Sequence, residues 1–578
     1  MKFSKLTRYI AALALLFGMN ACTDLSETLY DQLDADNFYT TKNTVIRAYV
    51  RPFEHAFWSI TPMYELQEEP SDQQGTYNRE GWWLDGGKYQ RLHYHTWTID
   101  DVSPQSGWNG NFQGIMQCNA VIDDFLVLDP DDFGMTRAEL DEMISGLRTM
   151  RAWFYINLLD LFRNVPLAVS VDPEKNSKGQ VPPQEIFNFI ESELKEVMPL
   201  LPAKESAGGN RLQQGQWNQG GAAALLVKLY LNAEKWTGTP KYTECADYAQ
   251  RIINGEFGYY KVAERWDEPF DWNNETSDEV IFAFTSSFSR AHWHMSSDMY
   301  WWSLPSNIEN YFGFKDWGGG NPKYALQPSR DVDGNLYNFT LGMPVHKFQK
   351  YPEDVRLKKY RNLSGDGQRE GMFLYGYLDY EENGQTIRVK SPNGYEYYIR
   401  DQVGMFKGAA PGTIIADKES NMNHADHNSG WHPVKYPIYR EEDPGCMEAD
   451  YALIRLPEIY YSLAECKLRS GDAGTAGTLL NEVRKRYYPS SKHREYLYQP
   501  EGSAVLDQNE LLDEWGREFL CEGRRRTDLC RWNKFTTGTW WDKEADNGSH
   551  LDIFPLHRNI LGANKDLVQN PGYDDIER

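Results

Sequence analysis

The stretch REFLCEGRRRTDLCRW, residues 517–532, holds five arginines and three acidic residues within sixteen positions. Arginine and glutamate alternate around Gly523, which suits ion pairs along a helix surface and across a helix end. Arginine also binds carboxylates through two parallel hydrogen bonds, which fixes the geometry of each pair. We therefore expect this stretch to form a salt-bridge network packed on a larger scaffold, and we assign it a structural role rather than a catalytic one.

The C-terminal stretch FPLHRNILGANKDLVQNPGY, residues 554–573, ends in a turn sequence. Gln569, Asn570, Pro571 and Gly572 are residue types that turns favour, because they supply local hydrogen bonds, a fixed backbone angle and conformational freedom. We expect this turn to hold the C-terminus against the body of the protein.

The N-terminus has the layout of a secretory signal peptide, with three basic residues before an apolar run over residues 9–17. A run of this length is too short for a membrane-spanning helix, which needs roughly 20 residues. Because a small residue precedes Cys22, the sequence predicts a bacterial lipoprotein with residues 1–21 as its signal peptide and Cys22 as its lipidated N-terminus. Ordinary signal cleavage beside an incidental cysteine is the alternative.

The chain is strongly acidic. Its net charge is −24, and removing residues 1–21, which hold three positive charges and no negative ones, gives −24 − 3 = −27. Such a chain is repelled by phosphate backbones, so we expect no nucleic-acid partner.

No motif indicates a metal, a cofactor or an enzyme. The six cysteines after Cys22 include no CxxC pair, and Cys118, Cys245, Cys466 and Cys521 lie in helix-like apolar surroundings, which favours buried free thiols. HExxH, GxSxG, P-loop and GxGxxG motifs are absent. We therefore predict neither a metal nor a cofactor.

Helical periodicity is concentrated toward the two ends of the chain. We predict helices over residues 108–128, 136–162 and 186–198, with Thr136 and Glu139 as a capping box at the start of the second. Helical hairpins are predicted over residues 222–253 and 452–486. The sequence LAECKLRSGDAGTAGTLLNEVRKR, residues 463–486, resembles a tetratricopeptide repeat, with Ala464 and Ala476 where its two helices would touch.

Between about residues 256 and 449 the composition changes to Gly, Asn, Asp, Pro and aromatic residues. Short alternating segments at residues 279–285 and 386–389 predict small strands. Long loops in a compact domain are usually functional or disordered, and the density of Trp, Tyr and Phe argues against disorder here. We interpret this region as an ordered, aromatic-rich insert.

Three stretches together resemble the SusD/RagB family of surface lipoproteins from Bacteroidetes. They are residues 517–532, residues 554–573, and LSETLYDQLDADNFYTTKNTVIRAYV at residues 25–50. The first keeps the family pattern at Arg517, Glu518, Glu522, Gly523, Arg525, Asp528, Leu529, Arg531 and Trp532. Departures are His557, where many relatives have a second proline, and Asn559, where an acidic residue is common.

The resemblance implies a mostly α, SusD-like fold with tetratricopeptide-type helical hairpins, long aromatic-rich loop insertions and few short strands. It implies a single domain over residues 22–578, with a helical scaffold at about 38–255 and 450–535 and a variable ligand-binding insert at about 256–449. It also implies a non-catalytic, lipid-anchored protein at the cell surface of the outer membrane. Such proteins capture oligo- or polysaccharide and act as a hinged lid on a SusC-like TonB-dependent barrel transporter.

Two aromatic segments are the candidate glycan site. Sugar rings stack their CH faces on flat aromatic rings, while their hydroxyls bond to nearby polar side chains. In the family the corresponding loops meet on one face, which is why we pair these two segments. The candidate residues are Trp82, Trp83, Asp85 and Tyr89 in the first segment, and His292, Trp293, Tyr300, Trp301 and Trp317 in the second. Since neighbouring side chains point opposite ways, we expect one tryptophan of each adjacent pair to be buried.

Two other functions stay open. Some relatives of the RagB type capture peptides, although the 19 tryptophans of this chain favour sugar. A surface glycoside hydrolase would need two carboxylates in a defined arrangement, and nothing in the sequence distinguishes such a pair among 84 acidic residues.

Overall fold

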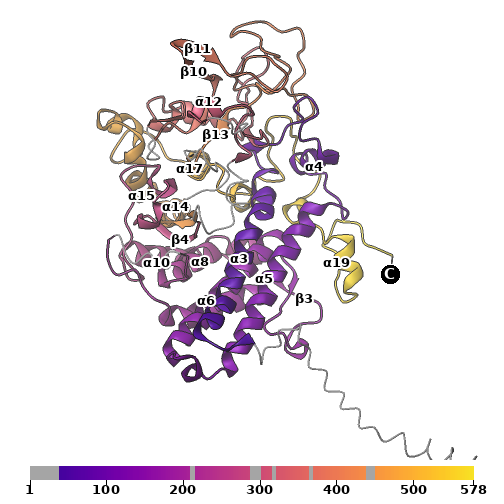
Figure 1. Ribbon diagram of the computed structural model, residues 1–578, viewed down its shortest axis with the longest axis vertical. Coiled ribbons are helices and arrows are strands. Elements are labelled where there is room, and N and C mark those ends of the chain that lie inside the picture. The colour runs from indigo at the N-terminus through magenta and orange to yellow at the C-terminus, as the bar shows by residue number, and fades with distance from the viewer. Residues whose placement is uncertain are drawn as a thin grey trace, which may run out of the picture.

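The computed structural model describes residues 38–207, 215–286, 301–314, 320–363, 369–437 and 449–577. Helices account for 46% of the residues. The long helices of the N-terminal half lie together in the lower part of Figure 1, and short strands and loops from the middle of the chain lie above them. The predicted mostly α fold is confirmed.

The scaffold is a series of helices in which each packs against the next along the chain. Their order is α3 (Lys42–Glu68), α5 (Val102–Val127), α6 (Arg137–Phe162), α7 (Pro183–Val197), α8 (Gln219–Leu231), α10 (Tyr242–Ile253), α14 (Leu456–Arg469) and α15 (Ala473–Arg484). Shorter helices are α4 (Lys88–His93), α9 (Ala233–Thr237), α12 (Glu309–Phe312), α13 (Pro344–Gln349), α16 (His493–Tyr496), α17 (Gln508–Glu518), α18 (Arg525–Arg531) and α19 (Arg558–Ala563).

The predicted helices agree with α5, α6, α7 and α10. Thr136 caps α6 by accepting the backbone N–H of Glu139, and the Glu139 carboxylate accepts the backbone N–H of Thr136, so the predicted capping box is confirmed. In the hairpin of α14 and α15, Ala464 and Ala476 are both fully buried. Small side chains at these positions let the two helices approach closely.

One boundary was predicted wrongly. Residues 452–455, expected to be helical, belong to β14 (Tyr451–Arg455), which pairs antiparallel with β4 (Val280–Phe284). The helix begins only at Leu456 because Pro457 lies in its first turn, where proline fits a helix start. The residues before it satisfy their backbone groups across the ribbon instead.

Within the described part of the chain, every sheet has two antiparallel strands. They are β1 (Gln74–Gly75) with β5 (Ala325–Leu326), β2 (Val165–Pro166) with β3 (Gln180–Val181), β4 with β14, β6 (Arg361–Asn362) with β7 (Arg369–Glu370), β8 (Phe373–Leu374) with β13 (His432–Pro433), β9 (Gly376–Tyr377) with β12 (Tyr398–Ile399), and β10 (Asp379–Glu382) with β11 (Gln385–Arg388). The predicted small strands at 279–285 and 386–389 correspond to β4 and β11. Over the same described residues, no helix is both long and apolar enough to cross a membrane.

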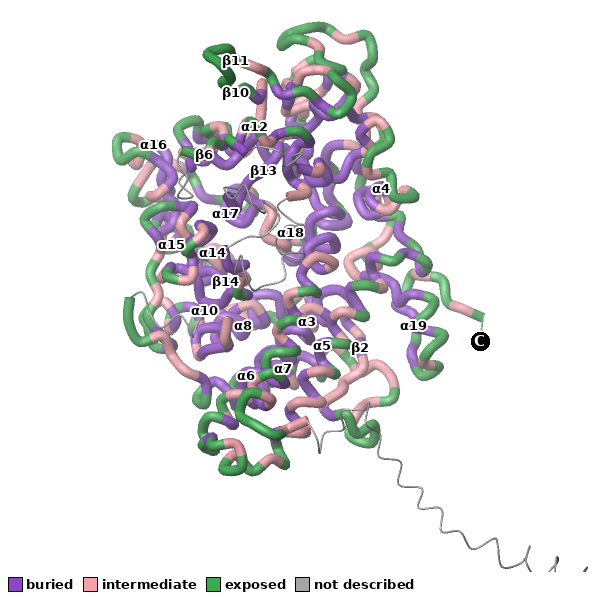
Figure 2. The backbone as a smooth tube through the Cα atoms, in the orientation of Figure 1, coloured by how far each residue is buried: buried purple, intermediate pink, exposed green. Residues whose placement is uncertain are grey.

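The main hydrophobic core lies among the helices. Figure 2 shows buried residues along α3, α5, α6 and α8. This core includes Trp97 and Trp108. Cys118, Cys245 and Cys466 are buried free thiols, whereas Cys521 is half-buried. A second core lies under the loops of the middle region and contains Leu304, Ile308, Phe312, Phe314, Tyr360, Leu374, Leu378, Val389, Tyr397, Ile399 and Val434.

The stretch 517–532 comprises the end of α17, a turn and α18, and its charges are buried in a network. Arg517 Nη2 lies 2.5 Å from Glu510 Oε1 and 2.7 Å from Glu514 Oε2. Glu518 Oε1 lies 3.1 Å from both Arg455 Nη1 and Arg486 Nη2. Each carboxylate of this group thus has a cation beside it in the interior, which is the condition for burying such charges.

The turn between α17 and α18 joins this network to the N-terminal helices. Gly523 has φ of +71°, which favours glycine, and its N–H donates to Glu68 at the end of α3 over 2.8 Å. Arg525 Nε binds Asp72 Oδ1 at 2.7 Å, and Arg526 Nη1 binds Asp160 Oδ2 of α6 at 2.9 Å. The structural role predicted for this stretch is therefore visible in its contacts.

The C-terminal turn is held by side-chain hydrogen bonds. Gln569 accepts the N–H of Leu556 and donates to its carbonyl, both over 2.8 Å. Asn570 donates to the Phe554 carbonyl over 2.7 Å. His557, one of the two departures from the family pattern, caps α19 by accepting the backbone N–H of Asn559 over 3.0 Å.

Candidate functional site

The loop over residues 80–87 has an unusual backbone. Glu80, Trp83 and Asp85 have positive φ angles of 53°, 63° and 41°, and Gly81, Gly86 and Gly87 are also left-handed. Positive φ is uncommon for residues with a side chain, and such strain is concentrated at functional sites where the surroundings impose it. The loop therefore qualifies as a candidate site on backbone geometry alone, independently of its aromatic composition.

Trp82 presents an exposed indole on this loop. It is 40% exposed, and its ring contacts the imidazole of His427 edge to face, with 5.6 Å between the ring centroids. Burial lowers the pKa of His427 to about 4, so this ring is neutral at pH 7. The indole thus rests on an uncharged support and keeps part of its surface open to solvent.

Polar groups of the loop and of the middle region are connected to Trp82 through His427. Glu80 accepts hydrogen bonds from Asn393 Nδ2 over 2.5 Å and from Tyr395 OH over 2.8 Å. The Tyr395 oxygen in turn accepts the backbone N–H of His427 over 3.0 Å. The His427 support of Trp82 is thus linked to a carboxylate, an amide and a phenol, which together can donate and accept hydrogen bonds.

Arg79 fastens the start of the loop to the interior. Its guanidinium is fully buried, and Nη1 donates to the carbonyls of Asp426 and Ser429 over 2.8 and 2.7 Å. Burial lowers its pKa from the ordinary arginine value. Moving a buried guanidinium away from its hydrogen-bond acceptors costs free energy, so these two bonds hold the start of the loop against residues 426–429.

Trp83 points the other way, into a box of aromatic rings around Lys323. The Lys323 Nζ lies 5.7 Å from the Trp83 ring centroid, 4.8 Å from that of Tyr89 and 4.1 Å from that of Trp302. Trp83 also contacts Trp302 edge to face at 6.1 Å. The two predicted segments therefore meet here, through Trp302.

The predicted site residues fall into four groups. Trp82 and Asp85 are exposed, and Trp83 and Trp301 are half-buried, with Trp301 packed against the second core. Tyr89 is only 2% exposed, and its burial argues against the predicted contact with a ligand. The remaining predictions lie outside the described residues: His292, Trp293, Tyr300, Trp317 and the lipidation site Cys22.

Several residues of this site were missed from the sequence. Trp302 is not one of them, because it belongs to the adjacent pair Trp301–Trp302 of the second aromatic segment. Lys323, Tyr395 and His427 had no local signal, since they lie in loop sequence far along the chain from Trp82 and only the fold brings them to it.

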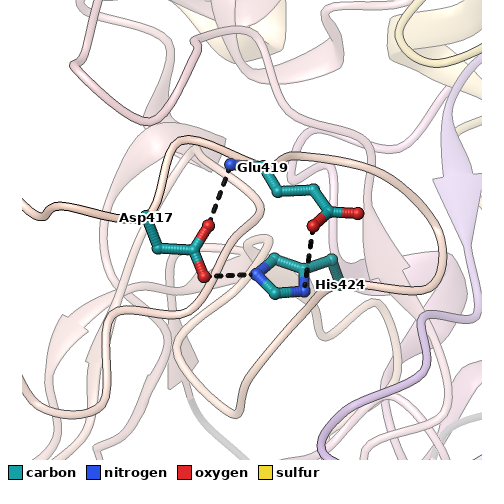
Figure 3. A group of neighbouring side chains, drawn as sticks. All are labelled: Asp417, Glu419 and His424. Atoms are coloured by element: carbon teal, nitrogen blue, oxygen red, sulfur yellow. Dashed lines mark hydrogen bonds and ion pairs between the residues drawn. The ribbon is translucent and has the colours of Figure 1, made fainter.

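Another polar group in the loops is formed by Asp417, Glu419 and His424, whose ligand-type atoms lie within 4.8 Å of one another (Figure 3). Asp417 Oδ2 is 2.7 Å from Nε2 of His424, whereas Glu419 Oε2 is 3.7 Å from Nδ1. The ring thus stands between the carboxylates and presents a different nitrogen to each. Zinc ligands must converge on one point, whereas these carboxylates face opposite nitrogens of the ring, so we describe the group as a paired histidine in an exposed loop.

Two family models match the chain. The model of the SusD family matches residues 202–573, and a model described as starch-binding and associating with the outer membrane matches residues 57–231. Together these matches include the loop of Trp82 and the stretch 517–532.

Individual relatives agree with the family match. The starch-binding protein SusD of Bacteroides thetaiotaomicron is 26% identical over 461 residues, which is 76% of this chain and 74% of that protein. A solved SusD homologue from Bacteroides thetaiotaomicron has a TM-score of 0.65 at 15% identity, covering 93% of this chain and 98% of its own.

The surface glycan-binding protein A of Bacteroides uniformis has a TM-score of 0.61 at 18% identity, covering 92% of this chain and 99% of its own. At these identities the two structural matches show a shared fold. Because the SusD family model covers more than half of the sequence, this protein belongs to the SusD family.

Proposed function

We propose that this protein captures a glycan by binding, without catalysis, and that Trp82 is the stacking platform of its site. The observation that carries the proposal is the exposed indole on a strained loop, supported by His427, with the hydrogen-bonded group of Glu80, Asn393 and Tyr395 linked to that support. A sugar ring can lie against the indole while its hydroxyls bond to the polar groups beside it. The names of two relatives, a starch-binding protein and a surface glycan-binding protein, support the same ligand class.

The test is isothermal titration calorimetry against a panel of soluble polysaccharides and peptides. Trp82→Ala should weaken binding of the glycan recognised by the wild type at least tenfold, because the variant has no indole on which a sugar ring can stack. A tenfold change in affinity corresponds to about 1.4 kcal/mol. Tyr259→Ala is the matched control, because Tyr259 is 39% exposed at another place on the surface. This control should bind as the wild type does.

Three results would overturn the proposal. They are binding to no glycan, binding to peptides instead, and the release of reducing ends from a bound polysaccharide, which would reveal a hydrolase.

We further propose that Cys22 is lipidated and anchors the protein at the outer surface of the outer membrane, where it delivers the glycan to a SusC-like TonB-dependent transporter. The signal-like N-terminus and the match to a family described as associating with the outer membrane support this placement. One lipid anchor and a short N-terminal segment would let the body move as a lid while it stays near its partner.

Cys22→Ser separates anchoring from recognition. The variant should bind glycan with unchanged affinity in solution, since Trp82 and its neighbours are untouched. Cells carrying it should lose uptake of that glycan, because the protein is released from the membrane. The measurements are calorimetry on the purified variant and growth on the glycan as sole carbon source. Normal growth with the released protein would contradict the lid role.

A further inference from the structure

Lys323 places a positive charge inside a box of aromatic rings. Its side chain is 2% exposed, and Nζ lies 4.1 Å from the ring centroid of Trp302, 4.6 Å from that of Tyr324 and 4.8 Å from that of Tyr89. Trp83 lies at 5.7 Å. Aromatic faces attract cations, and the attraction is stronger when the cation is removed from water. The ammonium group therefore lies within reach of four rings and also donates a hydrogen bond to the hydroxyl of Tyr324 over 3.0 Å.

An acidic side chain of the scaffold completes the box. Glu65 of α3 lies 3.5 Å from Lys323 Nζ, and the same carboxylate binds Lys88 Nζ at 3.0 Å and accepts from Ser103 Oγ at 2.6 Å. The box thus connects the scaffold helix α3, the loop that carries Trp82, and the segment 302–324. Trp302, Lys323 and Tyr324 lie more than 200 residues along the chain from the other two parts, and all of them meet at one ammonium group.

The strained loop needs such a support. Left-handed backbone at residues such as Trp83 persists only where surrounding contacts impose it. Arg79 fixes the loop at its start, whereas the side chain of Trp83 is held within the box. The Trp83 indole occupies this side of the loop, so Trp82 is left to face solvent.

We infer that Lys323 is a positioning residue for the ligand site: it fixes Trp83 and thereby the backbone conformation that presents Trp82. This inference rests on the proposed function of Trp82, but it concerns loop order, which can be measured without any ligand. A methionine at this position would keep much of the volume and remove the charge.

The test compares Lys323→Met with the wild type by amide hydrogen exchange and by glycan titration. Exchange in peptides covering residues 80–88 should become at least about tenfold faster, because a locally opened loop exchanges without global unfolding. Peptides from α5 and α6 should exchange as in the wild type, and glycan affinity should fall by about tenfold. Lys323→Arg, which keeps the charge, should restore most of the protection.

Lys543→Met is the matched control, since Lys543 is also buried, lies 5.3 Å from the Trp540 ring centroid and pairs with Asp546 at 2.7 Å. It should leave exchange at residues 80–88 unchanged.

If Lys323→Met does not fold, Glu65→Gln, which leaves the lysine within its rings, should produce a smaller increase in the same peptides. Unchanged exchange at residues 80–88, or equal acceleration in α5 and α6, would overturn the inference. If the wild type binds no glycan but Lys323→Met still exchanges faster at residues 80–88, the proposed function is wrong and the positioning role of Lys323 is supported.

Discussion

Trp82 and Trp83 are neighbours in sequence with opposite environments. One is 40% exposed over a neutral histidine, and the other contacts the aromatic box of Lys323. The alternation of neighbouring side chains is foreseeable from the sequence, but which of the two faces solvent is not. Trp83 contacts Trp302 and Lys323 whereas Trp82 contacts His427, and these three partners reach the loop only through the tertiary fold.

The buried charges around α17 give a prediction for Glu518. Its carboxylate accepts hydrogen bonds from Arg455, Arg486 and Tyr487, and it is 3% exposed. Glu518→Ala would leave buried guanidinium groups without part of their counter-charge, which costs about 3–5 kcal/mol. Urea unfolding followed by circular dichroism should show this decrease in the free energy of unfolding.

Glu482→Ala provides the comparison, because Glu482 pairs with Lys485 while both side chains are more than 40% exposed. An exposed pair is worth less than about 1 kcal/mol. A decrease of similar size in both variants would contradict the role assigned to burial.

At the scale of elements, α6 was predicted and α3 was not. The sequence of α6 has helical periodicity and a capping box, so both its start and its length could be foreseen. The 27-residue α3 contains Pro52 and Pro62, which disrupt helices in isolation. Packing against α5 and α6 stabilises it in spite of these prolines, and sequence periodicity does not report that packing.

The same contrast applies to other parts of the chain. The hairpin of α14 and α15 was found from its repeat-like sequence, while β14 was mistaken for helix because its partner β4 lies far away. The loop of Trp82 was found from its composition. Its strain and its supports are properties of the folded chain and have no signature in a local stretch of sequence.

The cap of α6 gives a prediction at this scale. Thr136→Ala removes the hydroxyl that accepts the N–H of Glu139, and removal of such a cap costs about 1 kcal/mol. Thermal unfolding should show a correspondingly lower midpoint. Thr136→Ser keeps the hydroxyl and should remain close to the wild type; an equal decrease with serine would assign the effect to the methyl group instead.

At the scale of the whole molecule, the charge network sets the response to acid. Burial alone would raise the pKa of Glu518, but Arg486 and Arg455 lower it to about 2. Glu510 is likewise lowered to about 2, with burial opposed by Arg517. The unfolded chain, with a pKa near 4.5 for these groups, binds more protons between pH 4.5 and 2. The free energy of unfolding must therefore fall as the pH falls through this window.

Between pH 6.5 and 4.5 two groups of buried residues oppose each other. Burial lowers the pKa of His93 and His432 to about 3, so acid favours their unfolded, protonated forms. Burial raises the pKa of Glu68 and Asp401 to about 7, so acid favours their folded, protonated forms. We expect a shallow pH dependence above 4.5 and a steep decrease in stability below it, measured by urea unfolding at successive pH values. A steep decrease already complete at pH 5 would contradict this balance.

The ribbon of β4 and β14 has an evolutionary consequence. Phe284 pairs directly with Tyr451, so the chain leaves the helical body and returns to it at the same point. The 166 residues between them form one excursion whose two ends are already side by side. Doubling the length of such a closed segment costs only about 0.6 kcal/mol in closure entropy. Surface loops of the excursion can therefore lengthen at little cost in descendants of this chain, whereas Arg356 and Lys435, which pair with Glu518 and Glu522, keep it tied to the helices.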